Sequence, residues 1–364
     1  MTRQCPIIGF DHVEFYVSNA KQTAYVYQHQ FGLAPIAFRG LETGHRKGAS
    51  YLLTQNNIRF VVSSGFDCHH PINVAVNRHG DGVGVIAFTV MNVPHVYQSV
   101  VQAGAKGMIP PTTLEDKDGR IQFAAIQGYG DGLFKFVDRH QYRGLFEPYY
   151  LPYVRSHTSI PDTGLMAIDH LVGNVDIGMM DHWADFFIQD LGFQLLAQFD
   201  QDKISTPSSA LMSKVVQTPT GSVRLPINEP APGQRMSQIE EYLKFNQGPG
   251  VQHIALSTDD IISTVQCLKQ AGVEFLSTPL TYYDDLMERV GPINEPIDQL
   301  AELGILVDRD TSGYLLQIFT QPMSDRPTLF FEIIQRHNAT SFGEGNFKAL
   351  FAAIEREQAR RGNL

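Results

Sequence analysis

The chain has 364 residues, of which 43% are hydrophobic and 18% are charged, so it is long enough for about two globular domains and is not dominated by disorder. Its formal net charge of −10 argues against broad binding to nucleic acids or anionic membranes, because either partner would repel it at long range. No apolar run approaches the roughly 20 residues that span a bilayer, and the N-terminal segment lacks a secretory signal pattern.

Cysteine usage points to a reducing compartment. Cys5, Cys68 and Cys267 lie far apart in the sequence and form no CxxC pair. An odd and sparse set of this kind gives no disulfide framework. We therefore expect a cytoplasmic protein.

The first half of the chain begins with an apolar strand over residues 10–17, which contains an Asp-His pair. A helical pattern follows over about residues 20–31, and further apolar strands are predicted at residues 82–88 and 133–139. A second helix and the turn Ala103-Gly104-Ala105 lie between these two strands. The pattern predicts a unit of one strand, one helix and then several strands, which occurs twice within this half of the chain.

The second half repeats this order. Residues 168–175 again contain an Asp-His pair, and a helix is predicted from about Met180 to Leu191. Residues 250–256 match residues 82–88, and residues 330–336 (FFEIIQR) match residues 133–139 (LFKFVDR). Three matched segments in the same order indicate a duplicated unit.

The connection between the halves, residues 146–153 (FEPYYLPY), has two prolines and no sustained period. We predict a first module without metal at residues 1–145, a linker at residues 146–164 and a catalytic second module at residues 165–364. The second module ends in a charged helix that reaches about Arg360.

The anchor positions of the repeated segments differ between the halves. The second half carries His170, His253 and Glu332, where the first half carries His12, Val85 and Lys135. Two imidazoles and one carboxylate form the facial triad typical of non-haem Fe(II). A single histidine in a strand is more often structural, but three donors at equivalent places in a duplicated unit favour a metal site. Valine has no donor atom and lysine would repel a dication, so we expect the first half to have lost the site.

Three other patterns are weaker. Cys68-His69-His70 resembles a ligand cluster, but adjacent residues rarely converge on one ion and no partner pair has zinc-finger spacing. His182 lies in an amphipathic helix, where packing or exposure is the simpler interpretation. The glycines of residues 128–132 lead into a strand rather than a helix, so they predict a turn and no phosphate site.

Several segments of the chain resemble the 4-hydroxyphenylpyruvate dioxygenase family of the vicinal-oxygen-chelate superfamily. The resemblance covers nearly the whole chain and is strongest over residues 166–362. Its most specific segments are residues 225–230 (LPINEP), 250–253 (GVQH), 302–310 (ELGILVDRD), 316–320 (LQIFT) and 331–336 (FEIIQR).

The resemblance implies an α+β fold of two modules, each made of paired βαβββ units that form an open barrel, with a C-terminal helix acting as a gate. It implies one Fe(II) per chain, held by His170, His253 and Glu332, and no catalytic residue beyond this metal centre. It further implies polar substrate contacts from Ser213, Asn228, Gln238 and Gln317, and an aromatic lining from Phe319, Phe330, Phe342 and Phe347.

The implied reaction converts 4-hydroxyphenylpyruvate and O2 to homogentisate and CO2 by decarboxylation, ring hydroxylation and side-chain migration, as in tyrosine and phenylalanine catabolism. The resemblance also implies a homodimer or homotetramer. Gln252 is adjacent to His253, so strand alternation predicts that its side chain points to the opposite face, away from the site.

Three alternatives stay open from the sequence. A 4-hydroxymandelate synthase shares the substrate, metal and fold. An extradiol catechol dioxygenase needs a further acid–base histidine, and in the second half only His182 and His337 remain, neither of which looks central. A binding protein that sequesters a small molecule in the barrel would not need the metal triad.

Overall fold

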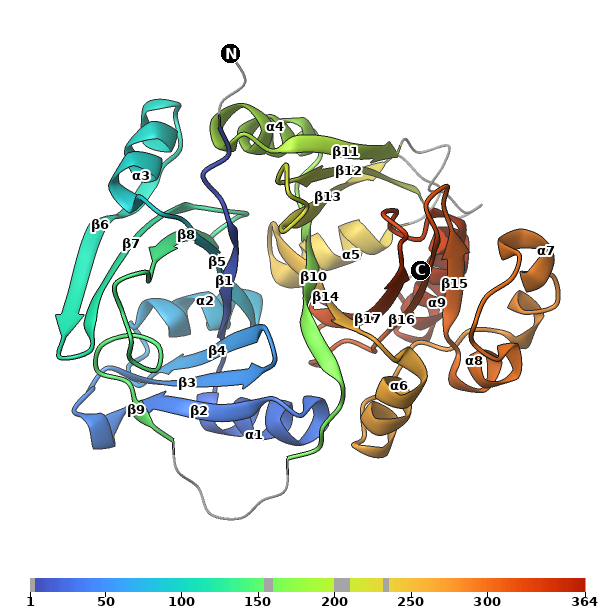
Figure 1. Ribbon diagram of the computed structural model, residues 1–364, viewed down its shortest axis with the longest axis horizontal. Helices are drawn as coiled ribbons and strands as arrows, with labels where there is room; N and C mark the ends of the chain where they lie inside the picture. The colour runs from blue at the N-terminus through green and yellow to red at the C-terminus, as the bar shows by residue number, and fades with distance from the viewer. Residues whose placement is uncertain (1–3, 154–159, 200–209, 232–235, 364) are drawn as a thin grey trace.

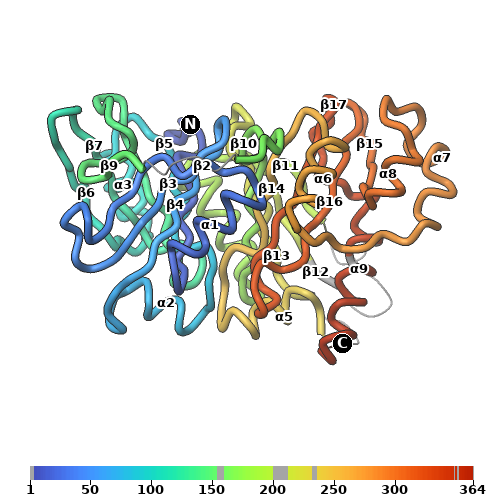
Figure 2. Tube along the Cα trace, turned by 90° about the horizontal axis from the view of Figure 1, so that it is seen from below, coloured from blue at the N-terminus to red at the C-terminus, as the bar shows by residue number. Residues whose placement is uncertain are grey.

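Two curved sheets lie side by side and together form the body of the molecule (Figure 1). The computed structural model describes residues 4–153, 160–199, 210–231 and 236–363. The first sheet is built from the N-terminal half of the chain and the second from the C-terminal half, and the two halves lie on opposite sides when seen from below (Figure 2). Within the described ranges, no helix is long and apolar enough to cross a membrane.

The two sheets have the same strand order. The first is ordered β6-β7-β8-β5-β1-β4-β3-β2-β9, and the second, read in the matching direction, β15-β16-β17-β14-β10-β13-β12-β11. The strands of the first sheet are β1 (Gly9–Tyr16), β2 (Ala34–Arg39), β3 (Gly48–Gln55), β4 (Ile58–Gly65), β5 (Gly82–Thr89), β6 (Gly107–Asp116), β7 (Gly119–Gln127), β8 (Leu133–Asp138) and β9 (Leu151–Pro152). Those of the second are β10 (Leu165–Asn174), β11 (Gln194–Phe199), β12 (Ala210–Gln217), β13 (Arg224–Ala231), β14 (Gly250–Thr258), β15 (Leu306–Arg309), β16 (Tyr314–Phe319) and β17 (Phe330–His337).

Helices pack against the sheets, some on their outer faces and others within their curves (Figure 1). They are α1 (Ala20–Phe31), α2 (Pro71–His79), α3 (Val93–Gln102), α4 (Met180–Asp185), α5 (Gln238–Asn246), α6 (Ile261–Gln270), α7 (Leu286–Val290), α8 (Ile297–Leu303) and α9 (Phe347–Arg360). The α+β architecture of two modules with a C-terminal helix is therefore confirmed.

Local sequence signals fix the ends of the first helix. The Asn19 side chain accepts a hydrogen bond from the Gln22 backbone N–H, and Gly32 ends the helix in the left-handed conformation at φ 70°. The corresponding helix of the second half differs from the prediction, because α4 ends at Asp185 and continues as a π-helical turn over Phe186–Asp190. Apolar spacing does not distinguish the two helix types over so short a segment.

An aromatic side chain of each module packs into the other module. Phe331 of β17 lies within the first module's core, with its ring centroid 4.9 Å from that of Phe31 and 6.0 Å from that of Phe60. Phe134, at the matching place in β8, packs on the second module's helix against Trp183 at 5.7 Å and Phe187 at 5.4 Å. Each module therefore completes the core of the other.

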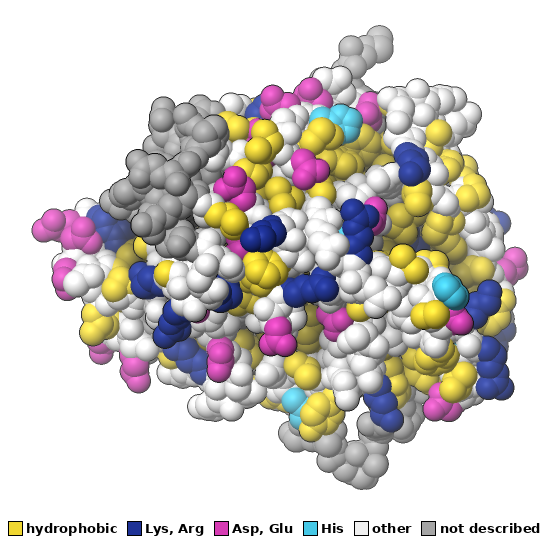
Figure 3. All heavy atoms as spheres, turned by 180° about the vertical axis from the view of Figure 1, so that it is seen from behind, with side chains coloured by type: hydrophobic (Ala, Val, Ile, Leu, Met, Phe, Trp, Pro, Cys, Tyr) yellow, Lys and Arg dark blue, Asp and Glu magenta, His cyan; other side chains and the backbone are white. Residues whose placement is uncertain are grey.

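The predicted linker contains a short strand, because Leu151 and Pro152 of β9 pair with Phe38 and Ala37 of β2. The first sheet thus reaches beyond residue 145, and the exact module boundaries remain a prediction. On the face drawn in Figure 3, acidic and basic side chains are interspersed among hydrophobic ones, with no broad area of one charge.

Candidate metal centre

The three predicted metal ligands lie on three adjacent strands of the second sheet. His170 is on β10, His253 on β14 and Glu332 on β17. Glu332 Oε2 is 3.2 Å from His170 Nε2 and 3.4 Å from His253 Nε2. All three side chains are buried, and their donor atoms lie within 4.8 Å of one another.

A β-bulge precedes each of the two histidines. The pairing of β10 with β14 skips Asp169 on one strand and Gln252 on the other. A bulge breaks the alternation of side chains, so the extra residue lies beside its neighbour instead of opposite it. As a result His170 Nδ1 donates to the Asp169 carboxylate at 2.8 Å, and His253 Nδ1 donates to Gln252 Oε1 at 3.0 Å.

These partners leave both Nε2 atoms facing Glu332. Burial alone would raise the pKa of Glu332, but His170 and then His253 outweigh it and lower this pKa to about 2. Burial lowers the pKa of His253, whereas at His170 the carboxylates of Glu332 and Asp169 outweigh burial and raise the pKa. An ionised carboxylate enclosed with two imidazoles is expensive to bury without a cation. The set is therefore consistent with a single metal ion.

A cavity opens beside these ligands and encloses about 580 Å³ of empty space, open solvent included. Seven of the eight predicted substrate-contact residues line it, namely Ser213, Asn228, Gln238, Phe319, Phe330, Phe342 and Phe347.

The polar lining residues come from two places. Ser213 on β12 and Asn228 on β13 are direct cross-strand partners. Gln238 is the first residue of α5, whose start is fixed by a capping box in which Ser237 accepts from the Glu240 N–H and Glu240 accepts from the Ser237 N–H. These three side chains are therefore presented by regular elements.

The aromatic lining contacts the ligands directly. The Phe342 ring meets His170 edge-on at 5.0 Å between centroids, and the Phe330 ring stacks on His253 at 4.8 Å. Phe347, at the start of α9, meets Phe199 of β11 edge-on at 5.4 Å. The metal side of the cavity is thus enclosed by hydrocarbon.

Two residues differ in placement from the expectations. Gln317 is buried, but it is not among the cavity-lining residues, and its Oε1 has no hydrogen-bond partner among the described residues. The prediction that Gln252 points away from the site is wrong, because the bulge turns it toward His253 and into the lining. Sequence reasoning also missed Phe199, although its pairing with Ser213 places it at the same level of the barrel.

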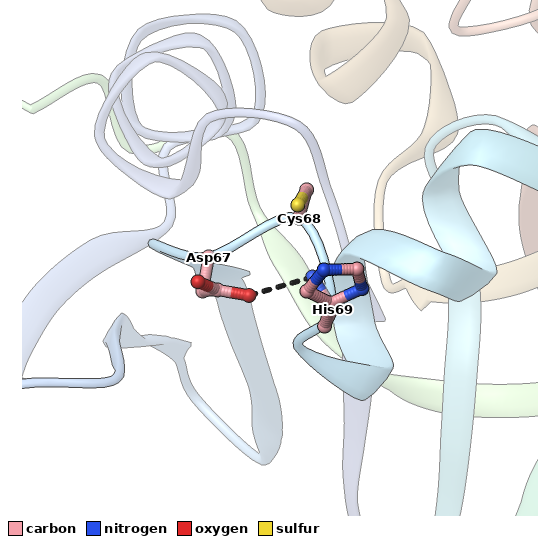
Figure 4. A group of neighbouring side chains, drawn as sticks. All are labelled: Asp67, Cys68 and His69. Atoms are coloured by element: carbon pink, nitrogen blue, oxygen red, sulfur yellow. Dashed lines mark hydrogen bonds between the residues drawn. The ribbon is translucent and has the colours of Figure 1, made fainter.

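The cluster around Cys68 is the other group of potential ligands among the described residues (Figure 4). The donor atoms of Asp67, Cys68 and His69 do lie within 4.8 Å of one another, but all three residues are exposed. One Asp67 carboxylate oxygen accepts the His69 backbone N–H at 2.7 Å, as in a turn that leads into α2. His182 is exposed on α4.

The first module holds an ion pair at the place equivalent to the metal centre. Lys135 Nζ donates to Glu147 Oε1 at 3.0 Å, and both side chains are largely buried. His12 is buried and bonded to Asp11, as His170 is to Asp169, but Lys135 stands in place of a carboxylate ligand, which leaves His12 a structural role. Val85 offers no donor, and the expected loss of the site agrees with these contacts.

Comparisons with known proteins agree with the geometry. Residues 3–151 match the family "Hydroxyphenylpyruvate dioxygenase, HPPD, N-terminal", and residues 167–318 match the "Glyoxalase/Bleomycin resistance protein/Dioxygenase superfamily". The chain is 45% identical to 4-hydroxyphenylpyruvate dioxygenase of Pyricularia oryzae, over 98% of this chain and 91% of that protein. It is 43% identical to the enzyme of the same name from Yarrowia lipolytica, over 98% and 93%.

Among solved structures, a variant of 4-hydroxymandelate synthase from Streptomyces coelicolor superposes with a TM-score of 0.84. It is 29% identical to this chain, and the match covers 97% of this chain and 99% of that one. The full-length matches above 40% identity decide the relationship. The chain belongs to the 4-hydroxyphenylpyruvate dioxygenase family.

Proposed function

We propose that this protein is an Fe(II)-dependent dioxygenase that converts 4-hydroxyphenylpyruvate and O2 to homogentisate and CO2. The observation that carries the proposal is the buried set of His170, His253 and Glu332 at the wall of a cavity lined by phenylalanines and a few polar side chains. The names of the full-length relatives support the same reaction.

The donor set favours iron. Two histidines and one carboxylate hold non-haem Fe(II) on one face and leave positions open for a substrate and O2. His170, His253 and Glu332 would hold the ion, which when bound would supply the oxygen chemistry for a 2-oxo acid substrate. Because the 2-oxo acid is part of the substrate, no second 2-oxo acid is needed.

The chain's own residues position the substrate. The rings of Phe330 and Phe342, which pack against the ligating histidines, offer apolar contacts to an aromatic ring. Ser213, Asn228 and Gln238 offer hydrogen bonds to a phenol group. Closure of the cavity by the loop before α9 would exclude water from a reactive centre.

No acid–base side chain is needed beyond the metal ligands. Among the described residues, the cavity lining contains His170 and His253 as its histidines and Glu332 as its carboxylate. His337 lies at the end of β17 and is paired with Glu295 at 2.7 Å. This lining disfavours an extradiol dioxygenase, which needs a further histidine at the metal.

A 4-hydroxymandelate synthase is the second candidate, favoured by the structural match to such an enzyme over almost the whole chain. Its 29% identity is lower than the 45% and 43% of the dioxygenases. We also propose a homodimer or homotetramer and a cytoplasmic location, which the three free cysteines would suit.

The deciding experiment is incubation of the iron-loaded protein with 4-hydroxyphenylpyruvate and O2, followed by identification of the product. Homogentisate supports the proposal, whereas hydroxymandelate would establish the second candidate. Glu332→Ala is the matched control and should lose both turnover and bound metal. The loss of metal affinity should exceed the factor of about 10–100 that is typical when a hydrogen-bond partner of a ligand is removed. Absence of turnover in the wild-type protein, with substrate binding unaffected by Glu332→Ala, would indicate a binding protein instead.

A further inference from the structure

His170 and three side chains around it form one connected group, which we call the C-terminal clasp: Arg336, Asp169, His170 and Phe342. Arg336 donates from Nε and from the Nη2 nitrogen to the two oxygens of Asp169, both at 2.8 Å. Asp169 in turn accepts from His170 Nδ1 at 2.8 Å, and Phe342 meets the His170 ring edge-on. Asp169 therefore contacts the metal ligand His170 at Nδ1, the nitrogen away from Glu332, and Phe342 contacts its ring.

Arg336 also reaches the loop that carries Phe342. Its Nη1 donates to the Ser341 carbonyl at 2.6 Å and to the Ala339 carbonyl at 3.3 Å. Its guanidinium carbon lies 5.4 Å from the centroid of the Phe342 ring. The partly buried guanidinium of Arg336 thus joins Asp169, the partner of a metal ligand, to a segment of the cavity wall.

The first module contains the same arrangement without the metal. In this N-terminal clasp, Arg139 donates to both Asp11 oxygens at 2.6 and 2.7 Å, and Asp11 is bonded to His12. Arg139 also donates to the Phe146 carbonyl, and the Phe146 ring meets His12 edge-on at 5.1 Å. Asp11 is a bulge residue in β1, as Asp169 is in β10.

The two metal histidines differ in their partners. His170 is bonded to a carboxylate that is held by a bidentate arginine, whereas His253 is bonded to the neutral amide of Gln252. A carboxylate on the far nitrogen of a ligating imidazole fixes the ring orientation and makes the ligand more basic. A bidentate pairing with arginine restricts that carboxylate to one orientation.

We propose that Asp169 and Arg336 are positioning residues of the proposed reaction. Asp169 holds His170 in the metal-binding orientation, and Arg336 ties that orientation to the Phe342 wall of the substrate cavity. The inference rests on the proposed function for the identity of the substrate, but its first test depends on metal binding alone.

The first test measures the affinity for Co²⁺ by competition with a chelator, together with the visible spectrum of the bound ion. Asp169→Asn should weaken binding by about 10–100-fold and change the spectrum. Asp11→Asn is the matched control, because it breaks the same contact in a module that has no triad. It should lower the melting temperature yet leave Co²⁺ affinity and spectrum unchanged. Equal affinity and identical spectra in the two variants would overturn the role of Asp169.

The second test separates the two contacts of Arg336. At saturating iron, Asp169→Asn should keep the wild-type KM for 4-hydroxyphenylpyruvate within about 2-fold, because the loop contacts remain, while its metal affinity falls. Arg336→Gln should lower metal affinity and also raise KM, whereas Arg139→Gln should do neither. If Arg336→Gln fails to fold, Arg336→Lys keeps the charge but loses the bidentate contact, and should show both effects in weaker form. A wild-type KM in a folded Arg336 variant would overturn the link to Phe342.

These outcomes are distinguishable from failure of the proposed function. If Glu332→Ala retained wild-type Co²⁺ affinity, the metal centre itself would be wrong. If Asp169→Asn and Asp11→Asn behaved alike while Glu332→Ala lost the metal, only the positioning role would be wrong.

Discussion

The two modules share strand order, bulge positions and an arginine-bound Asp-His pair, yet only the second brings three metal-binding donors together. In the first module the carboxylate position carries Lys135, and Glu147 enters from the connection to neutralise it. The centre of the second module thus carries three potential metal ligands, whereas the centre of the first carries a lysine paired with a glutamate. The comparison shows that the framework around the histidine does not depend on the metal.

At the central site the difference between the modules is confined to a few side chains, whereas the core that the two modules share is extensive. Phe331 and Phe134 occupy matching strand positions and pack into opposite modules. Because Phe331 precedes Glu332, the strand that presents the metal carboxylate is anchored in the module that lacks a metal. We therefore expect the first module to serve as structural support for the second.

The largest expected effect tests this support. Phe331→Ala removes a ring that is 1% exposed and contacts four aromatic rings of the first module. We expect the free energy of unfolding in urea to fall by about 3–5 kcal/mol, as for other buried phenylalanines. Phe134→Ala is the reciprocal variant and should lose a similar amount.

The single tryptophan distinguishes the two variants, because Trp183 contacts Phe134 and not Phe331. Phe134→Ala should change the fluorescence of the native protein, while Phe331→Ala should leave it unchanged. A loss below about 1 kcal/mol for Phe331→Ala would contradict the view that the modules share one core.

The ion pair of the first module predicts the next effect. Lys135→Met leaves the buried Glu147 without its ammonium partner, although Arg139 remains 3.9 Å away. We expect a loss of about 3 kcal/mol in the free energy of unfolding, because a buried charge without its partner is costly. The double variant Lys135→Met, Glu147→Leu removes both charges and should recover most of this loss. Equal stability of the single and double variants would show that the pair is not energetically coupled.

The same ion pair predicts a dependence on pH. Burial would raise the pKa of Glu147, but Lys135 and then Arg139 outweigh it and lower this pKa to about 2, from 4.5. A carboxyl whose pKa is lower in the folded than in the unfolded state stabilises the fold at pH values above its pKa in the unfolded chain. This contribution is lost as the pH falls from 4.5 toward 2. Between about pH 6 and about pH 3, the wild-type protein should therefore lose more stability than the double variant. Urea unfolding at both pH values measures this, and parallel losses would contradict the assignment.

The sequence predicted those parts of the site that depend on residue identity at repeated positions. His170, His253 and Glu332 were found because they occupy repeated positions, at which the first copy keeps His12 but carries Val85 and Lys135 in place of the other two donors. The bounds of α1 agree with the helical pattern predicted over about residues 20–31, and in the structure the Asn19 side chain and the conformation of Gly32 fix its two ends locally.

The rest depended on how strands deviate from regularity and on contacts between modules. Gln252 was misplaced because a two-residue period assumes a strand without a bulge. The exchange of Phe134 and Phe331 between modules is set by the packing of two folded units, which no local pattern encodes. Gln317 has the predicted strand position, but the loop at Gly343 packs against it.

The smallest expected effect concerns that loop. Gly343 has φ 76°, and a Cβ atom there would lie 2.4 Å from Gln317 Nε2. Gly343→Ala should cost about 1–2 kcal/mol for the left-handed conformation and should also displace Gln317 or the loop. We therefore expect a several-fold rise in KM for 4-hydroxyphenylpyruvate with unchanged metal affinity. Gly362→Ala is the control, because Gly362 has φ 71° but no atom within 4 Å of its Cβ position. If both variants showed the same KM, the loop around Gly343 would not shape the cavity. The contrast between the two modules at this level would then be limited to the side chains at their centres.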